Sequence, residues 1–101
     1  MKLVLITIMK EFEKDICNLF KASGISIYST STIEGHKIQK PENIQDNWFS
    51  AERDTYDSKL YFAFTSEELI DKMLNEIEIF NVNKAETNPV RAVVLNVEKF
   101  I

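Results

Sequence analysis

The residue pair with the clearest potential for chemistry is Glu34 and His36, which stand two positions apart at the start of a long polar segment. On an extended backbone these side chains project to the same side, where a carboxylate and an imidazole could share a divalent metal ion. Two ligands make a weak metal site, so a pair of solvated side chains is the simpler interpretation. Because a homo-oligomer would multiply the ligands, a metal ion stays open as an alternative.

The remaining residues give no sign of catalysis. The chain has one histidine and one cysteine, and no nucleophile stands beside a base. No glycine-rich turn is present that would bind an oxyanion or a phosphate. Cys17 follows Ile16 in a helical stretch, where a buried or half-buried thiol is the expected state. We therefore expect a protein that is not an enzyme.

The segment best suited to binding a partner covers residues 34–58. It is polar and of mixed charge, with Trp48 and Phe49 near its middle and the charged pair Glu52-Arg53 close by, whose arginine is a further candidate contact. Connections of this length are uncommon in a compact domain unless they are functional or disordered. Tryptophan is enriched at binding hot spots, although both aromatic residues are equally compatible with packing on their own or a neighbouring subunit. The segment predicts a partner-binding loop.

Length and composition restrict the chain to one globular domain, residues 1–101. Its residues are 45% hydrophobic and 28% charged, which suffices for one buried core but not for two. The net charge of −4 argues against binding a phosphate backbone, which usually requires a basic face. The apolar run over residues 3–9 is too short for a membrane span or a signal-peptide core. We expect a cytoplasmic protein that is not inserted into a membrane.

The elements that position these residues follow from hydrophobic periodicity. Segments rich in β-branched and other apolar residues predict strands at residues 1–8, 25–33, 59–64 and 90–97. Apolar residues at helical spacing predict one helix over residues 10–23, ended by Gly24 in a left-handed conformation. A second helix is expected to begin at a capping box over residues 65–68 and to end before the polar turn at 81–89.

The resulting element order, β-α-β-β-α-β, predicts a ferredoxin-like α+β fold. Right-handed crossovers would place both helices on one face of a four-stranded antiparallel sheet, with the long loop between the second and third strands. The strands alternate poorly between apolar and polar residues, since Leu3 and Val4 would face opposite sides of the sheet. Burial of an apolar open face against other copies, in closed cyclic symmetry, is the simplest arrangement, so we expect a homo-oligomer.

Two segments, residues 24–39 and 59–69, resemble the PII signalling family. The first carries a glycine after a helix, a strand and Glu34-Gly35 at the foot of a long loop. The second carries the third strand and an acidic-capped helix, and the likeness in layout runs over about residues 1–80. This resemblance implies a trimer of ferredoxin-like subunits with inward-turned sheets and adenine nucleotides in the clefts between subunits. It also implies a loop that contacts a partner such as a membrane transporter or a metal-efflux pump.

The same resemblance implies candidate ligand-binding residues. Gly35 and Gln39 match the first glycine and the glutamine of the family's loop-base motif, and Ser29 stands where the family has a serine or threonine near the nucleotide. Lys59 corresponds to a lysine at the foot of the third strand, displaced by about one position. Arg91 is a further candidate, and ordinary surface charges are the competing interpretation for both cations.

Other parts of the family's phosphate-binding motifs are missing from this sequence. The second glycine and the arginine of the loop-base motif are replaced by Lys37 and Ile38, and no glycine follows the second helix. Phosphates are usually held by close-approaching backbone amides together with cationic side chains. The sequence therefore gives weak support to ATP binding of the usual PII kind, and the cofactor stays open between an adenine nucleotide and a divalent metal ion.

Two other kinds of ferredoxin-like protein are alternatives. A CutA-like metal-tolerance trimer shares the fold and assembly but differs in loop layout. An RNA-binding module would use aromatic residues on the open face of the third strand, for which Tyr61, Phe62 and Phe64 are candidates. RNA binding is the least favoured interpretation, because the first strand has no aromatic residue and the chain is acidic.

Overall fold

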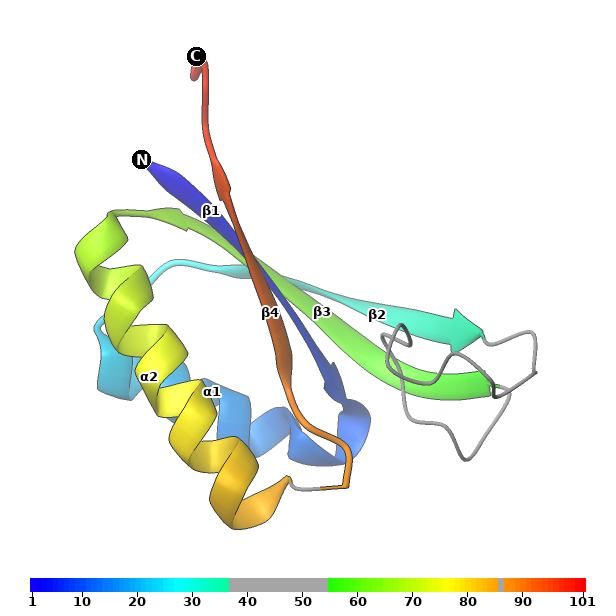
Figure 1. Ribbon diagram of the computed structural model, residues 1–101. Helices are drawn as coiled ribbons and strands as arrows, with labels where there is room; N and C mark the ends of the chain where they lie inside the picture. Colours follow the sequence, from blue (N-terminus) through cyan, green and yellow to red (C-terminus); the bar gives the residue numbers. More distant parts are fainter. Residues whose placement is uncertain (37–54, 86) are drawn as a thin grey trace, which may run out of the picture.

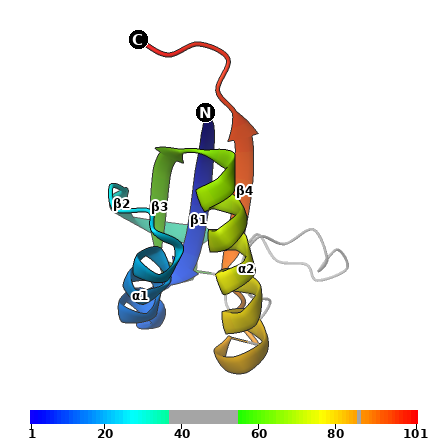
Figure 2. The same ribbon diagram turned by 90° about the vertical axis from the view of Figure 1, so that its left-hand side faces the viewer.

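An antiparallel sheet covered on one face by helices forms the body of the molecule (Figures 1 and 2). The computed structural model describes residues 1–36, 55–85 and 87–101. Within them the strands are β1 (Lys2–Met9), β2 (Ser29–His36), β3 (Thr55–Thr65) and β4 (Arg91–Asn96), and the α-helices are α1 (Glu13–Ser23) and α2 (Glu67–Lys84). The strands lie in the order β2-β3-β1-β4 with every pair antiparallel, which confirms the ferredoxin-like prediction.

The hairpin formed by β2 and β3 is longer than the sequence pattern predicts. The two strands remain paired as far as His36 and Thr55, whereas we predicted a loop over residues 34–58. Main-chain groups on an exposed hairpin pair whatever the polarity of the side chains, so the polar composition concealed these strand residues. The predicted loop therefore begins and ends as strand, and residues 37–54 lie outside the described residues.

Gly24 ends α1 in the left-handed conformation that we predicted, with a φ of 88°. Its N–H donates to the carbonyl oxygen of Phe20 at 3.1 Å. Ile25 then turns into the core instead of entering the sheet, and its N–H donates to the Oγ of Ser23 at 3.3 Å. For this reason β2 begins at Ser29 and not at residue 25 as predicted.

Replacement of Gly24 by alanine is expected to destabilise the protein by about 1 kcal/mol, because the left-handed conformation is unfavourable for a residue with a Cβ atom. An added Cβ would lie 3.5 Å from Cδ2 of Leu69, an ordinary contact, so the cost comes from the backbone. Differential scanning calorimetry should show a melting temperature lower by about 4–8 °C. Gly24→Asn should lose less, since asparagine tolerates this conformation; equal losses for both variants would contradict the explanation.

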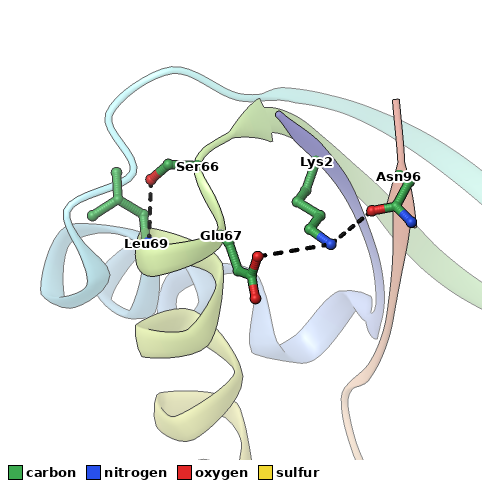
Figure 3. A network of polar contacts seen from close by, with 5 residues as sticks. All are labelled: Lys2, Ser66, Glu67, Leu69 and Asn96. Atoms are coloured by element: carbon green, nitrogen blue, oxygen red, sulfur yellow. Dashed lines mark hydrogen bonds and ion pairs between the residues drawn. The ribbon is translucent and has the colours of Figure 1, made fainter. Parts of the chain in front are cut away.

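The beginnings of both helices differ from the predicted ones. A turn of 3₁₀ helix, η1 (Lys10–Phe12), precedes α1. Ser66 caps α2, and its Oγ accepts a hydrogen bond from the N–H of Leu69 at 3.4 Å (Figure 3). The predicted capping residue, Thr65, is still paired with Lys2 in the sheet, so its backbone does not lie at the helix start. α2 also runs past its predicted end at residue 80, because the helix breaker, Pro89, comes only later in the chain.

A small polar network ties the start of α2 to the sheet (Figure 3). Nζ of Lys2 donates to Oδ1 of Asn96 at 2.6 Å and lies 3.9 Å from Oε1 of Glu67. The carboxylate of Glu67 is exposed, so the ion pair contributes at most about 1 kcal/mol to stability. The network nevertheless joins the first residue of β1, the last of β4 and the first turn of α2.

The core lies between the two helices and one face of the sheet. Val4 and Ile6 of β1 point toward the helices and are fully buried. The Phe20 ring of α1 stacks on Tyr28 with 3.9 Å between ring centroids, and Tyr61 of β3 lies 5.8 Å away. Tyr61 is therefore a core residue, and only Phe62 and Phe64 of the three aromatics considered for RNA binding belong to the other face.

The face of the sheet away from the helices is also apolar, as the poor alternation predicts. Phe64, Leu3 and Leu95 are aligned in one row across β3, β1 and β4. Phe62, Leu5 and Val93 form the next row. Figure 2 shows both helices on the opposite side of the sheet, so they do not cover these side chains. The two rows together are called the apolar open face below.

Candidate functional site

Polar side chains continue the open face toward the root of the β2–β3 hairpin. The row that follows Leu5 contains Ser31, Leu60, Thr7 and Arg91 across β2, β3, β1 and β4. Because neighbouring strands are about 4.8 Å apart, Ser31 and Arg91 stand at opposite edges of the sheet, about 14 Å from each other. A guanidinium group and hydroxyl groups can bind an anionic ligand, so this row is the candidate site.

A buried hydroxyl group lies next to this row. Ser58 of β3 is opposite Met9 of β1 and Ile33 of β2, one step nearer the hairpin, and it is almost fully buried. Its Oγ has no hydrogen-bond partner in the part of the chain that the structure describes. A buried hydroxyl group without a partner costs about 1–3 kcal/mol, and at 1% exposure Ser58 is closed to a ligand in this structure.

The predicted ligand residues divide between the two faces of the sheet. Ser29 is opposite Phe62 and lies on the open face, at the edge formed by β2, while Arg91 lies on the open face at the β4 edge. Lys59 points to the helix side, where Nζ forms an ion pair with Oε2 of Glu13 at 3.1 Å. Only 15% of its side chain is exposed. Within one chain the structure therefore does not bring Ser29, Lys59 and Arg91 together.

The predicted metal-ligand pair lies at the far end of β2. Nε2 of His36 is 3.1 Å from Oε1 of Glu34, and both side chains are exposed. Gly35, between them, is opposite Tyr56 in the hairpin. Among the described residues no group of three or more His, Cys, Asp and Glu side chains is arranged to hold a metal ion. Metal binding by Glu34 and His36 stays a prediction.

The other predicted residues lie outside the described residues; they are Gln39, Trp48, Phe49 and the pair Glu52-Arg53. The structure does show where the chain leaves and re-enters the sheet around them. Figure 1 places this end of the β2–β3 hairpin far from both termini. No helix in the described ranges is long and apolar enough to cross a membrane.

Sequence reasoning missed a link that positions the candidate arginine. Nδ2 of Asn81, in α2, donates to the carbonyl oxygen of Val90 at 3.0 Å, and the N–H of Val90 donates to Oδ1 of Asn81 at 2.7 Å. This pair of hydrogen bonds fixes the entry into β4, directly before Arg91. In the sequence, Asn81 is only a polar residue near the expected end of a helix, and this does not show what its side chain binds.

A second feature missed from the sequence is a cleft of about 420 Å³ beside the end of α1. Its lining includes Cys17, Lys21 and Tyr28. Cys17 is half-buried, as predicted, and the hydroxyl group of Tyr28 donates to its Sγ at 3.6 Å. This hydrogen bond and the burial of the ring raise the pKa of Tyr28. The cleft lies beside the stacked rings of Phe20 and Tyr28.

Burial also raises the pKa of Tyr61 above its usual value of 10.0. Folding therefore favours the neutral phenol, and this contribution to stability is fully present below pH 10 and is lost as the pH rises through the raised pKa. We expect the melting temperature of the wild type to fall more steeply above pH 10 than that of Tyr61→Phe, which has no proton to lose. Parallel pH profiles from about pH 8 to 11.5 would show that Tyr61 ionises equally in the folded and unfolded states.

Comparison with solved structures finds the same architecture in a PII-like protein. CPII, a nitrogen regulatory PII-like protein from Thiomonas intermedia K12, was solved bound to ADP, AMP and bicarbonate. It matches 99% of this chain and 94% of its own with a TM-score of 0.62 and 16% sequence identity. No protein-family model matches the chain, and no curated protein matches it. At this level of identity the similarity establishes the fold.

Proposed function

We propose that this chain, whose fold is that of the PII-like proteins, is a non-enzymatic cytoplasmic regulator that forms a homotrimer. It binds a small anionic ligand between subunits and acts on a partner protein through the segment 34–58. A membrane transporter or a metal-efflux pump is the partner class that the resemblance to PII proteins suggests. The observation that carries the proposal is the apolar open face, which a monomer would expose to water.

Assembly with cyclic symmetry would bury the apolar open face. If three copies turn their sheets inward, Phe62, Leu5 and their neighbours are buried at the centre while the helices stay outside. Each copy then contributes two different sheet edges, and the β4 edge of one copy meets the β2 edge of the next. This contact is heterologous, as every contact in a ring of three must be.

The same arrangement assembles the candidate ligand site. Arg91 lies at the β4 edge, and Ser29 and Ser31 lie at the β2 edge, on the same face and at neighbouring levels. They are far apart within one chain but approach each other across the contact between two copies. The ligands named for CPII are all anions, and a guanidinium group facing hydroxyl groups suits such a ligand. We therefore expect each ligand to contact two subunits.

Isothermal titration calorimetry with ADP, AMP and bicarbonate tests this function, with light scattering on the same samples. Replacing Arg91 with alanine should weaken binding of the recognised ligand at least tenfold, since a hydrogen bond to a charged group contributes about 1.5–3 kcal/mol. Lys72→Ala, which removes a positive charge from the exposed side of α2, is the matched control and should bind normally. Both variants should remain trimeric.

Three results would count against parts of the proposal. A monomeric wild type at micromolar concentration would overturn it entirely. A trimer in which Arg91→Ala binds as tightly as Lys72→Ala would remove Arg91 from the ligand site. A trimer that responds to Zn²⁺ alone, with the response lost in His36→Ala, would favour the metal-binding alternative.

A further inference from the structure

Exposed apolar side chains gather at two opposite edges of the sheet, close to the end that holds the termini. On the β3 side, 48% of Phe64 and 83% of Ile27 are exposed. On the β4 side, 45% of Leu95 and 71% of Phe100 are exposed. Phe64 and Leu95 flank Leu3 in the same row, so the two groups lie at the same level of the sheet.

The edge of β3 is open at this level. β3 continues to Thr65, but the pairing with β2 stops where Ser29 is opposite Phe62. Main-chain groups of an antiparallel strand point alternately to its two neighbours, so some groups of residues 63–65 face away from β1. In the described part of the chain, no further backbone hydrogen bond involves these residues. The edge can therefore accept another extended segment.

Ile27 precedes β2 and is not paired with this edge. Extending the β2–β3 register by two residues places Ile27 level with Phe64. Its side chain is nevertheless the more exposed of the two. Together, Ile27 and Phe64 give the open edge of β3 an apolar border on the outer corner of the sheet. A partner for this corner must supply both an extended backbone and an apolar side chain.

The segment after β4 has these properties. The N–H of Val97 donates to the carbonyl oxygen of Met1 at 3.3 Å, and this bond extends the sheet by one residue. Residues 98–101 then leave the body of the molecule, as Figures 1 and 2 show. Phe100 lies in this segment and is largely exposed. Five extended residues span about 16 Å, more than the roughly 10 Å of an edge three residues long.

The geometry points to residues 97–101 of one subunit packing along the open β3 edge of the next subunit, with Phe100 against Phe64 and Ile27. This inference rests on the proposed cyclic trimer, in which the β4 edge of each copy meets the β2–β3 side of its neighbour. Because Asn96 is level with Thr65, the segment that follows β4 begins where the neighbour's open edge ends, and its length allows it to turn back along that edge. Each subunit thus donates one segment and receives another.

Two variants test the donated segment (residues 97–101) and the receiving β3 edge separately. Phe100→Asp disables the donated segment, and Ile27→Asp disables the receiving edge, with a charge placed where an apolar contact is expected. Neither residue is buried, so both variants should fold, which far-ultraviolet circular dichroism can verify. In native mass spectrometry each variant alone should lose the trimer. Ile79→Asp, which changes an exposed apolar residue of α2, should remain trimeric.

An equimolar mixture of the two variants tests the pairing of donated segment and receiving edge most directly. Ile27→Asp retains an intact donated segment, and Phe100→Asp retains an intact receiving edge, so one contact between unlike subunits is restored. The expected product is a one-to-one pair that cannot close into a ring.

The possible failures have different meanings. A trimeric Phe100→Asp variant, with a trimeric wild type, would overturn the packing of residues 97–101 and leave the proposed function intact. Two monomeric variants that form no mixed pair would overturn the donor-and-receiver pairing. A monomeric wild type would overturn the proposed function itself.

Discussion

Replacing Phe62 with aspartate is expected to convert the proposed trimer to monomers at micromolar concentration. Phe62 lies in the middle of the apolar open face, in the row with Leu5 and Val93, and its ring contacts Phe64 edge to face at 6.3 Å between centroids. A carboxylate buried there without a partner costs several kcal/mol, and threefold symmetry would bury three of them. Multi-angle light scattering measures the change directly.

The matched control for this experiment is Val82→Asp, which introduces the same charge at an exposed apolar residue of α2. It should leave the proposed trimer unchanged, because α2 lies on the other side of the sheet. A trimeric Phe62→Asp variant would mean that subunits do not meet through the open face. The explanation of the poorly alternating strands would then fail with it.

The second large effect is expected at Phe20, where truncation to alanine should destabilise the fold by about 3–5 kcal/mol. Only 1% of Phe20 is exposed. Its ring stacks on Tyr28 with an angle of 7° between ring planes. Since small domains have about 5–15 kcal/mol of total stability, the variant should lose a large share of it and unfold at a clearly lower urea concentration.

Urea denaturation followed by circular dichroism measures this loss. Phe20→Leu keeps most of the apolar volume and should lose no more than about 1–2 kcal/mol. The difference between the two variants reports the cavity rather than the lost aromatic stacking. Equal losses in the two variants would show that the stacking on Tyr28, and not the filled volume, is the main contribution of Phe20.

The order of the elements and the two-sided character of the strands could be predicted from the sequence, because both depend on local apolar patterns. The assignment of Leu3 and Val4 to opposite faces of the sheet required only the alternation of side chains along a strand. The ends of the elements were less predictable. The strand residues Glu34 and Ser58 are polar, and Thr65 and Ser66 are both good helix caps, so the pairing of Thr65 with Lys2 had to be known to choose between them.

The positions of single residues in the candidate site were also difficult to predict from local sequence patterns. Lys59 was matched to a position displaced by about one residue, and a shift of one residue in a strand moves a side chain to the other face of the sheet. Lys59 consequently reaches Glu13 on the helix side, while Arg91 and Ser29 lie on the open face. The link between Asn81 and Val90 depends on how α2 and β4 meet in space, which no local pattern encodes.

The ion pair between Lys59 and Glu13 has a mechanical consequence. β1 pairs with β3 only as far as Met9 opposite Ser58, so within the described residues the hairpin beyond this level consists of β2 and β3. Such two-stranded ribbons twist and bend more readily than a wider sheet. The Lys59–Glu13 ion pair joins the base of this two-stranded part to the first residue of α1. A bend of the two-stranded part would displace His36 and Thr55 at its end, while the core under the helices would keep its packing.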